Sequence, residues 1–153
     1  MRRLVVLSLL GSLGCGGSRP QGPTPQSIND TVAQFLTAVK GNDLTRMEEL
    51  WGDAHGPAIS RWKAKELRQR VTVIQRYLWH SGYRIVDGPM AVPGHDDLRT
   101  FRVELQREQC NVVATLDVVR TERGAWLVLD PHLETLPNPA RRCGPNTQGT
   151  GPG

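Results

Sequence analysis

The segment SINDTVAQFLTAVKGNDLTRMEELW, residues 27–51, decides the fold because it encodes two helices and the break between them. Ser27 and Asp30 form the S-x-x-D pattern that caps the start of a helix. Apolar side chains then recur at the spacing of one helical face, at Val32, Phe35, Leu36 and Val39. Gly41 is a residue type that commonly ends a helix, so we expect the first helix to run from Ser27 to Gly41.

A second, shorter helix is predicted directly after this glycine. Asp43 can accept a hydrogen bond from the backbone of the first turn. Leu44, Met47 and Trp51 then lie on one side of the helix, and Gly52 ends it. The segment therefore predicts a pair of helices joined by a tight turn.

A third helix is predicted from about Ser60 to Trp79, and Gly82 terminates it. Its apolar stripe at positions i, i+4, i+7 and i+11 consists of Leu67, Val71, Ile74 and Leu78. Four basic residues lie within a narrow arc of this helix, away from the apolar stripe: Arg61, Lys65, Arg68 and Arg76. We interpret this arc as a solvated helix face; the alternative is a contact surface for anionic envelope polymers or lipid headgroups.

From Tyr83 onward the pattern alternates between apolar and polar residues, which is typical of strands. The predicted strands are Tyr83–Val86, Arg99–Gln106, Asn111–Arg120 and Ala125–Leu133, with a turn near Glu122-Arg123-Gly124. Three helices followed by four strands indicate an α+β fold, with the three N-terminal helices packed on a curved antiparallel sheet of about four strands.

The helix pair in residues 32–51 resembles the opening of nuclear transport factor 2-like domains, with the apolar face, the glycine break and the aspartate cap in matching places. The aromatic-led last strand, residues 125–129, is also similar, so the resemblance covers Ser27 to roughly Leu136. The family usually has a strand pair between its second and third helices, for which Gly52 to Ile59 leaves little room.

The resemblance implies a cone-like sheet with a pocket on its concave face. Relatives use this pocket for polyketide cyclisation, steroid isomerisation, small-molecule binding or protein contact, and the fold does not choose among these uses. Relatives that do chemistry place an Asp, His or Tyr inside the cone. No residue of this chain aligns with such a group, so no catalytic residue is carried over.

The best candidates for a pocket site are Trp126, Asp130 and His132, which point the same way if the last strand is regular. A carboxylate beside an imidazole can tune a general base when the pair is enclosed. Pro131 sits between them, however, and proline marks the edge or end of a strand. We therefore favour a solvated pair over a catalytic one.

Cys15 closes a short apolar run that begins after Arg2 and Arg3. The run is too short to span a bilayer, and together with the small residues before Cys15 it predicts a signal peptide over residues 1–14. The end of this segment resembles a bacterial lipoprotein signal. The resemblance implies that Cys15 is lipidated and carries acyl chains such as palmitate, which would hold the protein in a membrane.

The alternative is an ordinary secretory signal with an unmodified cysteine. Gly16 and Gly17 lack the aspartate that retains many lipoproteins in the inner membrane, so the resemblance favours the outer membrane. Residues 15–26 are then the lipidated cysteine and a flexible tether, 27–136 the folded domain, and 137–153 a tail rich in proline and glycine.

The other two cysteines, Cys110 and Cys143, are predicted to form a disulfide in an exported protein. If the last two strands extend far enough, Leu136 lies opposite Cys110 and the tail can fold back to it. Such a bridge contributes on the order of 3 to 4 kcal/mol in the chain-entropy model. The alternative is two free thiols.

Composition excludes several classes of protein. The formal charge of +4 includes Arg2 and Arg3, so the mature chain has 17 basic and 15 acidic residues, which argues against nucleic acid as a partner. There is no G-x-S-x-G, no phosphate-binding glycine loop and no H-E-x-x-H sequence, and we expect no cofactor and no metal. His95-Asp96-Asp97 is predicted to lie in an exposed loop, where a weak Ca²⁺ or Zn²⁺ contact is the less favoured use.

Two other residue types are given structural roles. His55 and His80 stand alone at helix ends and are expected to cap or to lie at the surface. The four tryptophans are expected to fill the core, namely Trp51, Trp62, Trp79 and Trp126. From these observations we expect a membrane-anchored envelope lipoprotein that binds an envelope protein or a small apolar ligand without catalysis. The alternative is a small pocket enzyme of the isomerase or cyclase type that uses Asp130 and His132.

Overall fold

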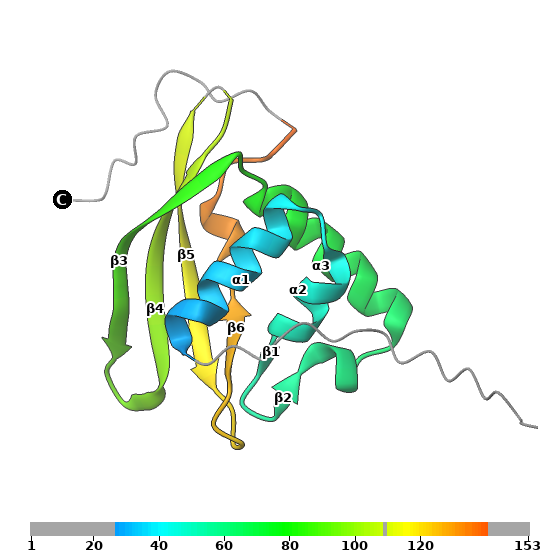
Figure 1. Cartoon of the computed structure of the whole chain (residues 1–153), viewed down its shortest axis with the longest axis vertical. Helices are drawn as coiled ribbons and strands as arrows, with labels where there is room; N and C mark the ends of the chain where they lie inside the picture. Colours follow the sequence, from blue (N-terminus) through cyan, green and yellow to red (C-terminus); the bar gives the residue numbers. More distant parts are fainter. Residues whose placement is uncertain (1–26, 109, 141–153) are drawn as a thin grey trace, which may run out of the picture.

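The computed structural model describes residues 27–108 and 110–140. Within them, three α-helices lie on one side of a four-stranded antiparallel sheet, as Figure 1 shows. The strands of this sheet follow the order β3-β4-β5-β6, so each pairs with the next along the chain. The predicted α+β class, with N-terminal helices packed on an antiparallel sheet of four strands, is confirmed.

Helix α1 (Ile28–Lys40) has the predicted ends. The Ser27 hydroxyl oxygen accepts a hydrogen bond from the Asp30 backbone N at 3.2 Å, which caps the first turn. At the other end, the Gly41 N–H donates to the Thr37 carbonyl at 2.9 Å. Val32, Phe35, Leu36 and Val39 are fully buried, so the predicted apolar face is the one that packs into the core.

Helix α2 (Leu44–Leu50) begins at the predicted cap, where the Asp43 carboxylate accepts from the Arg46 backbone N at 2.9 Å. The turn between α1 and α2 differs from expectation in one residue. Gly41 has an ordinary right-handed φ of −78°, and Asn42 takes the left-handed conformation at φ 55°. Asparagine is one of the few residue types with a side chain that adopt this conformation readily.

The short segment before the third helix forms a hairpin of two-residue strands, β1 (Gly52–Asp53) and β2 (Gly56–Pro57). A 3-10 helix, η1 (Ala58–Ser60), follows it. Helix α3 (Ala64–Leu78) therefore starts later than the predicted Ser60. Its predicted stripe is buried on one face: Leu67, Val71, Ile74 and Leu78.

The edge strand β3 (Gly82–Val92) is longer than the predicted Tyr83–Val86. It continues through Gly88 and Pro89, which are joined by a cis peptide bond, with three register shifts against its neighbour. A Gly-Pro pair ordinarily marks a turn, which is why the sequence pattern ended the strand too early. Proline is tolerated here because β3 has a hydrogen-bonded neighbour on one side only.

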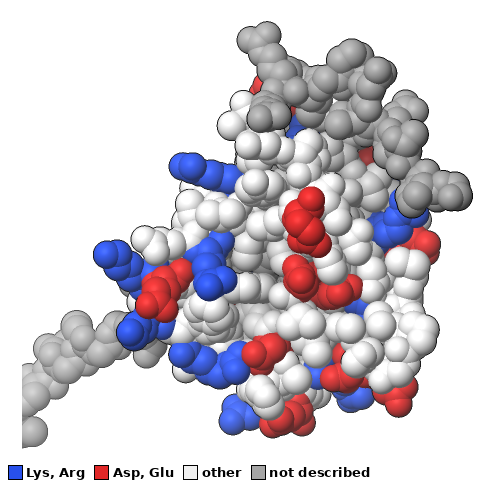
Figure 2. Space-filling view, turned by 180° about the vertical axis from the view of Figure 1, so that it is seen from behind, with Lys and Arg blue, Asp and Glu red and all other residues white. Residues whose placement is uncertain are grey.

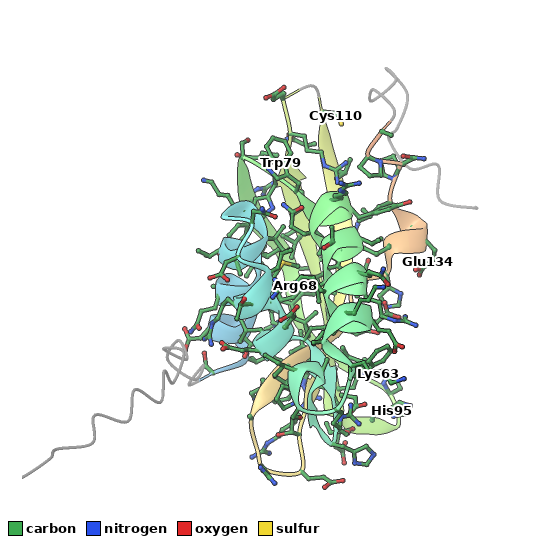
Figure 3. The ribbon with its side chains drawn as sticks, turned by 90° about the vertical axis from the view of Figure 1, so that its right-hand side faces the viewer. Lys63, Arg68, Trp79, His95, Cys110 and Glu134 are labelled. Atoms are coloured by element: carbon green, nitrogen blue, oxygen red, sulfur yellow. The ribbon has the colours of Figure 1, made fainter. Side chains whose placement is uncertain are left out.

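Strand β4 (His95–Gln106) also starts earlier than predicted. The turn before it is confined to Pro93 and Gly94, and Gly94 has a φ of 80°. The prediction that His95, Asp96 and Asp97 lie in a loop is therefore wrong, although all three are exposed as expected. Figure 3 shows His95 near the end of the molecule opposite Trp79.

Strand β5 (Asn111–Arg120) has the predicted bounds, and the turn at residues 121–125 leads to β6 (Trp126–Asp130). The predicted last strand, Ala125–Leu133, is too long because pairing ends at Asp130, one residue before a proline. The chain then forms a second 3-10 helix, η2 (Leu133–Thr135). The predicted pairing of Leu136 opposite Cys110 is accordingly not part of the described hairpin.

The core fills the space between the helices and the sheet. Alternate residues of β4, Phe101, Val103 and Leu105, are fully buried beneath the helices. Their partners in β5 are Leu116, Ala114 and Val112, and these belong to the same cluster, as does Val118. Burying each large apolar side chain stabilises the fold by roughly 1.5–3 kcal/mol. The opposite face of β4 and β5 carries polar side chains, including Thr100, Arg102, Glu104 and Asp117.

Several predictions fall outside the described residues, namely the signal peptide over 1–14, the lipidated Cys15, the tether over 15–26 and most of the tail. Cys143 also falls outside them, so its pairing with Cys110 stays a prediction. None of the helices in the described part of the chain is both long enough and apolar enough to cross a membrane.

Candidate functional site

The end of β6 places the two predicted polar residues in an arrangement that differs from a regular strand. His132 adopts a left-handed backbone conformation, with φ 43° and ψ 52°. One carboxylate oxygen of Asp130, Oδ1, accepts a hydrogen bond from the His132 backbone N at 2.9 Å. This bond holds the turn after Pro131, and the imidazole lies beside the neighbouring strand β5.

The His132 ring is bound at both nitrogens. Its Nε2 lies 2.9 Å from Asp117 Oδ2 on β5, and its Nδ1 lies 3.0 Å from Glu134 Oε1 on η2. The other oxygen of Asp117 accepts a hydrogen bond from the Thr100 hydroxyl at 2.6 Å. Side chains from β4, β5 and the segment after β6 thus form one connected polar cluster.

The surroundings of His132 raise its pKa above the ordinary value of 6.5. The largest cause is the hydrogen bond with Asp117; burial opposes it, and Glu134 and the charge of Asp130 add to the increase. The pKa of Glu134 is lowered by a backbone hydrogen bond and by the bond with His132. With carboxylates at both nitrogens, the imidazolium form donates on both sides.

The predicted set of Trp126, Asp130 and His132 is only partly brought together. Asp130 and His132 meet, but Trp126 lines a separate pocket. Sequence reasoning missed Asp117 and Glu134. An acidic residue within the valine-rich strand NVVATLDVVR was the available signal for Asp117, and it identified no partner.

The separate pocket has a volume of about 500 Å³ and lies between α2, the β1–β2 hairpin, η1 and the β5–β6 turn. Its lining combines buried apolar residues, Leu50 and Leu127, with Ile59, which is 41% exposed. Trp126 and Pro57 complete the apolar part of the wall. The hairpin and the β5–β6 turn lie at the lower end of the molecule in Figure 1.

Charged side chains surround this pocket, and most of them are paired. Arg46 lies 2.8 Å from Glu49, and both side chains are largely buried. Arg61 pairs with Asp53, and His55 Nδ1 lies 2.9 Å from Glu122 Oε1 at the exposed rim. The apolar wall is thus bordered by paired polar side chains, and the Arg61–Asp53 pair links the end of η1 to the hairpin.

The tryptophans do not all fill the core as predicted. Trp51 is partly buried, and its Nε1 donates to the Leu129 carbonyl at 3.0 Å. Trp126 is also partly buried against the core. The prediction is wrong for Trp62 and Trp79, which are 37% and 40% exposed. The guanidinium of Arg70 lies 4.5 Å from the centroid of the Trp62 ring, a cation–π contact.

The basic arc of the third helix is partly neutralised. Arg61 precedes the helix and pairs with Asp53, while Arg68 reaches α2, where its Nε lies 2.9 Å from Glu48 Oε1. Figure 3 shows Arg68 on the face of α3 that adjoins α2. Figure 2 shows lysine and arginine side chains mixed with acidic ones on the α3 side of the rear view. The interpretation as a solvated face is therefore favoured for this arc.

The two isolated histidines have different environments. His55 is exposed, as predicted. His80 is fully buried, which contradicts a surface role, whereas its contact with Leu78, the last residue of α3, fits the predicted capping role. Its Nδ1 lies 2.9 Å from the Leu78 carbonyl, and its Nε2 has no hydrogen-bond partner among the described residues. Burial, the largest cause, lowers the pKa of His80, and the charges of Lys40 and Arg107 act in the same direction.

Comparison with known proteins adds little to this description. No family model matches the chain, and no curated protein matches it. Among solved structures, one named "Rd1NTF2_04 with long sheet" is similar at 13% sequence identity, with a TM-score of 0.40. That match covers 67% of this chain and 96% of the other. The class of fold, helices on one face of an antiparallel sheet, follows from the elements above, and it does not specify a ligand or a reaction.

Proposed function

We propose that this chain is a bacterial envelope lipoprotein whose nuclear transport factor 2-like domain is a non-catalytic binding module, anchored through Cys15 in the outer membrane. The observation that carries the binding role is the pocket of about 500 Å³ on the side of a filled core. This volume lies within the range typical of small-molecule sites. An open apolar wall with a charged border fits either a small apolar ligand or an apolar side chain of an envelope protein.

The filled core favours binding over catalysis. The sheet side chains that face the helices are apolar and almost completely buried, so they occupy the place where relatives keep an internal pocket. The polar cluster around His132 lies on the other face of β5 and shares no residue with the pocket. The enzyme alternative with Asp130 and His132 would require a substrate to reach an imidazole whose two nitrogens already contact carboxylates.

The binding role is tested by native mass spectrometry of the mature protein isolated from a bacterial envelope, with its mass after denaturation as the reference for any bound molecule. We expect an adduct of small-molecule size, or a co-purifying envelope protein, on the wild type. Replacing Ile59 by aspartate puts a charge on the apolar wall and should abolish it. Val73 is the matched control because it is a similarly exposed apolar residue outside the pocket, and Val73→Asp should retain the adduct.

The anchor is tested separately by cell fractionation. Wild-type protein should enter the outer-membrane fraction, and Cys15→Ser should release it to the soluble fraction while leaving the pocket intact. A wild-type chain that is soluble would contradict the lipoprotein part of the proposal. Loss of binding by both the Ile59 and Val73 variants would contradict the pocket part, since the effect would then not be specific to the pocket.

A further inference from the structure

Three side chains at and just after the end of the last strand converge, and none of them belongs to the proposed binding pocket. One ligand atom from each of Asp130, His132 and Glu134 lies within 4.8 Å of the other two. One pair of these atoms, His132 Nδ1 and Glu134 Oε1, is 3.0 Å apart. Donor atoms bound to one tetrahedral zinc ion at its usual bond lengths are separated by about 3.4 Å. Small side-chain rotations would therefore allow all three atoms to contact a single ion.

The imidazole is oriented by a group outside this set. Asp117 Oδ2 holds Nε2 at 2.9 Å and leaves Nδ1 directed at Glu134. Asp117 is itself held by the Thr100 hydroxyl at 2.6 Å, and its side chain is only 19% exposed. Metal-binding histidines almost always donate their second ring nitrogen to a carboxylate or carbonyl in this manner. The arrangement thus has both a ligand set and the support that a ligating imidazole needs.

The charges around the cluster favour a cation. Asp117, Asp130 and Glu134 surround one imidazole, and no ion pair in the described residues joins any of these three to a lysine or arginine. Figure 2 shows acidic side chains close together near the middle of the rear face, with the lysine and arginine side chains mainly toward its edges. Figure 3 shows Glu134 on η2 at the edge of the molecule, pointing outward, so an ion has access from solvent.

The donor types indicate which ion. One imidazole nitrogen and two carboxylates suit Zn²⁺ and similar divalent transition metals, whereas Ca²⁺ takes six to eight oxygen ligands. Asp130 Oδ1 is occupied by the His132 backbone N, which leaves Oδ2 to contact an ion. We propose that Asp130, His132 and Glu134 form a site for a divalent transition-metal ion such as Zn²⁺, with Asp117 as the residue that positions the imidazole.

The test is calorimetric titration of the full-length chain, held in detergent and stripped of metal, with Zn²⁺, Ca²⁺ and Mg²⁺. We expect Zn²⁺ to bind at one site more tightly than Ca²⁺ or Mg²⁺. His132→Asn is the informative variant because asparagine accepts the left-handed backbone of this position. His132→Asn and Glu134→Gln should each weaken Zn²⁺ binding by at least about tenfold, and Asp117→Asn by about 10- to 100-fold.

The control is the other histidine–aspartate cluster, at the start of β4. His95→Gln combined with Asp97→Asn should leave Zn²⁺ affinity unchanged, and thermal melting in the absence of metal should show that every variant is folded. Nitrogen NMR tests the assigned ligand atom. On addition of Zn²⁺, the signal of His132 Nδ1 should shift more than the signal of Nε2. Absence of Zn²⁺ binding by the wild type would overturn the proposal, as would affinity unaffected by His132→Asn or Ca²⁺ binding as tight as Zn²⁺ binding.

Discussion

The β1–β2 hairpin offers a sharp test of how the pocket is built, because Gly52 leaves no room for a side chain. A Cβ atom added at Gly52 would lie 2.8 Å from Pro57 Cα and 2.9 Å from the Leu127 side chain, and it would also meet the Gly56 carbonyl oxygen. Two of these neighbours are backbone atoms of β2 and cannot rotate away. Gly52→Ala therefore forces β1 and β2 apart or moves the hairpin away from β6.

The size of the effect follows from these contacts. Inserting a methyl group into a packed site costs typically about 1–3 kcal/mol, and clashes with backbone place Gly52→Ala at about 2–3 kcal/mol. For a domain of this size, such a loss lowers the melting temperature by roughly 8–12 °C. Since Gly56, Pro57 and Leu127 line the pocket, ligand binding should weaken as well.

The assay is thermal unfolding followed by circular dichroism, with Gly41→Ala as the matched control. Gly41 has a φ of −78°, and a Cβ there would lie 3.4 Å from the Thr37 carbonyl oxygen, so alanine fits without strain. We expect Gly41→Ala to change stability by less than about 1 kcal/mol. A Gly52→Ala protein as stable as the wild type would refute the close packing of the hairpin against β6.

Three further outcomes are expected. Because burial lowers the pKa of His80, its contribution to stability is present above pH 6.5 and is lost as the pH falls below that value. His80→Phe should therefore reduce the acid destabilisation seen in melts between about pH 7 and 5. Asn42→Val should cost about 1–2 kcal/mol in chemical denaturation because of the left-handed backbone, while Asn42→Gly should be tolerated. The non-reduced protein should be two hydrogens lighter than the same protein after reduction, and Cys110→Ser should remove that difference if Cys110 pairs with Cys143.

The helices could be predicted from sequence because the signals that set them are local. Ser27 and Asp43 accept hydrogen bonds from residues three positions later, so the sequence alone shows both the cap and its donor. Strand ends depend instead on neighbouring strands. The sequence pattern ended β3 at Val86 because Gly88 and Pro89 are turn residues, yet pairing with β4 carries them into the sheet.

The candidate site depends on contacts between residues that lie farther apart in the sequence. Asp117 and His132 are brought together by the register of β5 against β6, which pairs Asp117 with Asp130. No local pattern specifies that register, and Asp117 by itself is one polar residue on the exposed side of a strand. Leu127 and Ile59 are also far apart in the sequence. They meet at the pocket because the β1–β2 hairpin brings the two regions together in space.

The wrongly predicted end of the last strand explains why the cluster can hold an ion at all. In a regular strand, residues i and i+2 point the same way but stand roughly 6.6 Å apart, which is too far for side chains at positions 130, 132 and 134 to share one ion easily. Pairing stops at Asp130, and the left-handed turn at His132 brings the three ligand atoms within 4.8 Å of one another. The proline that first argued against a catalytic pair thus ends the strand at the point where these donors can converge.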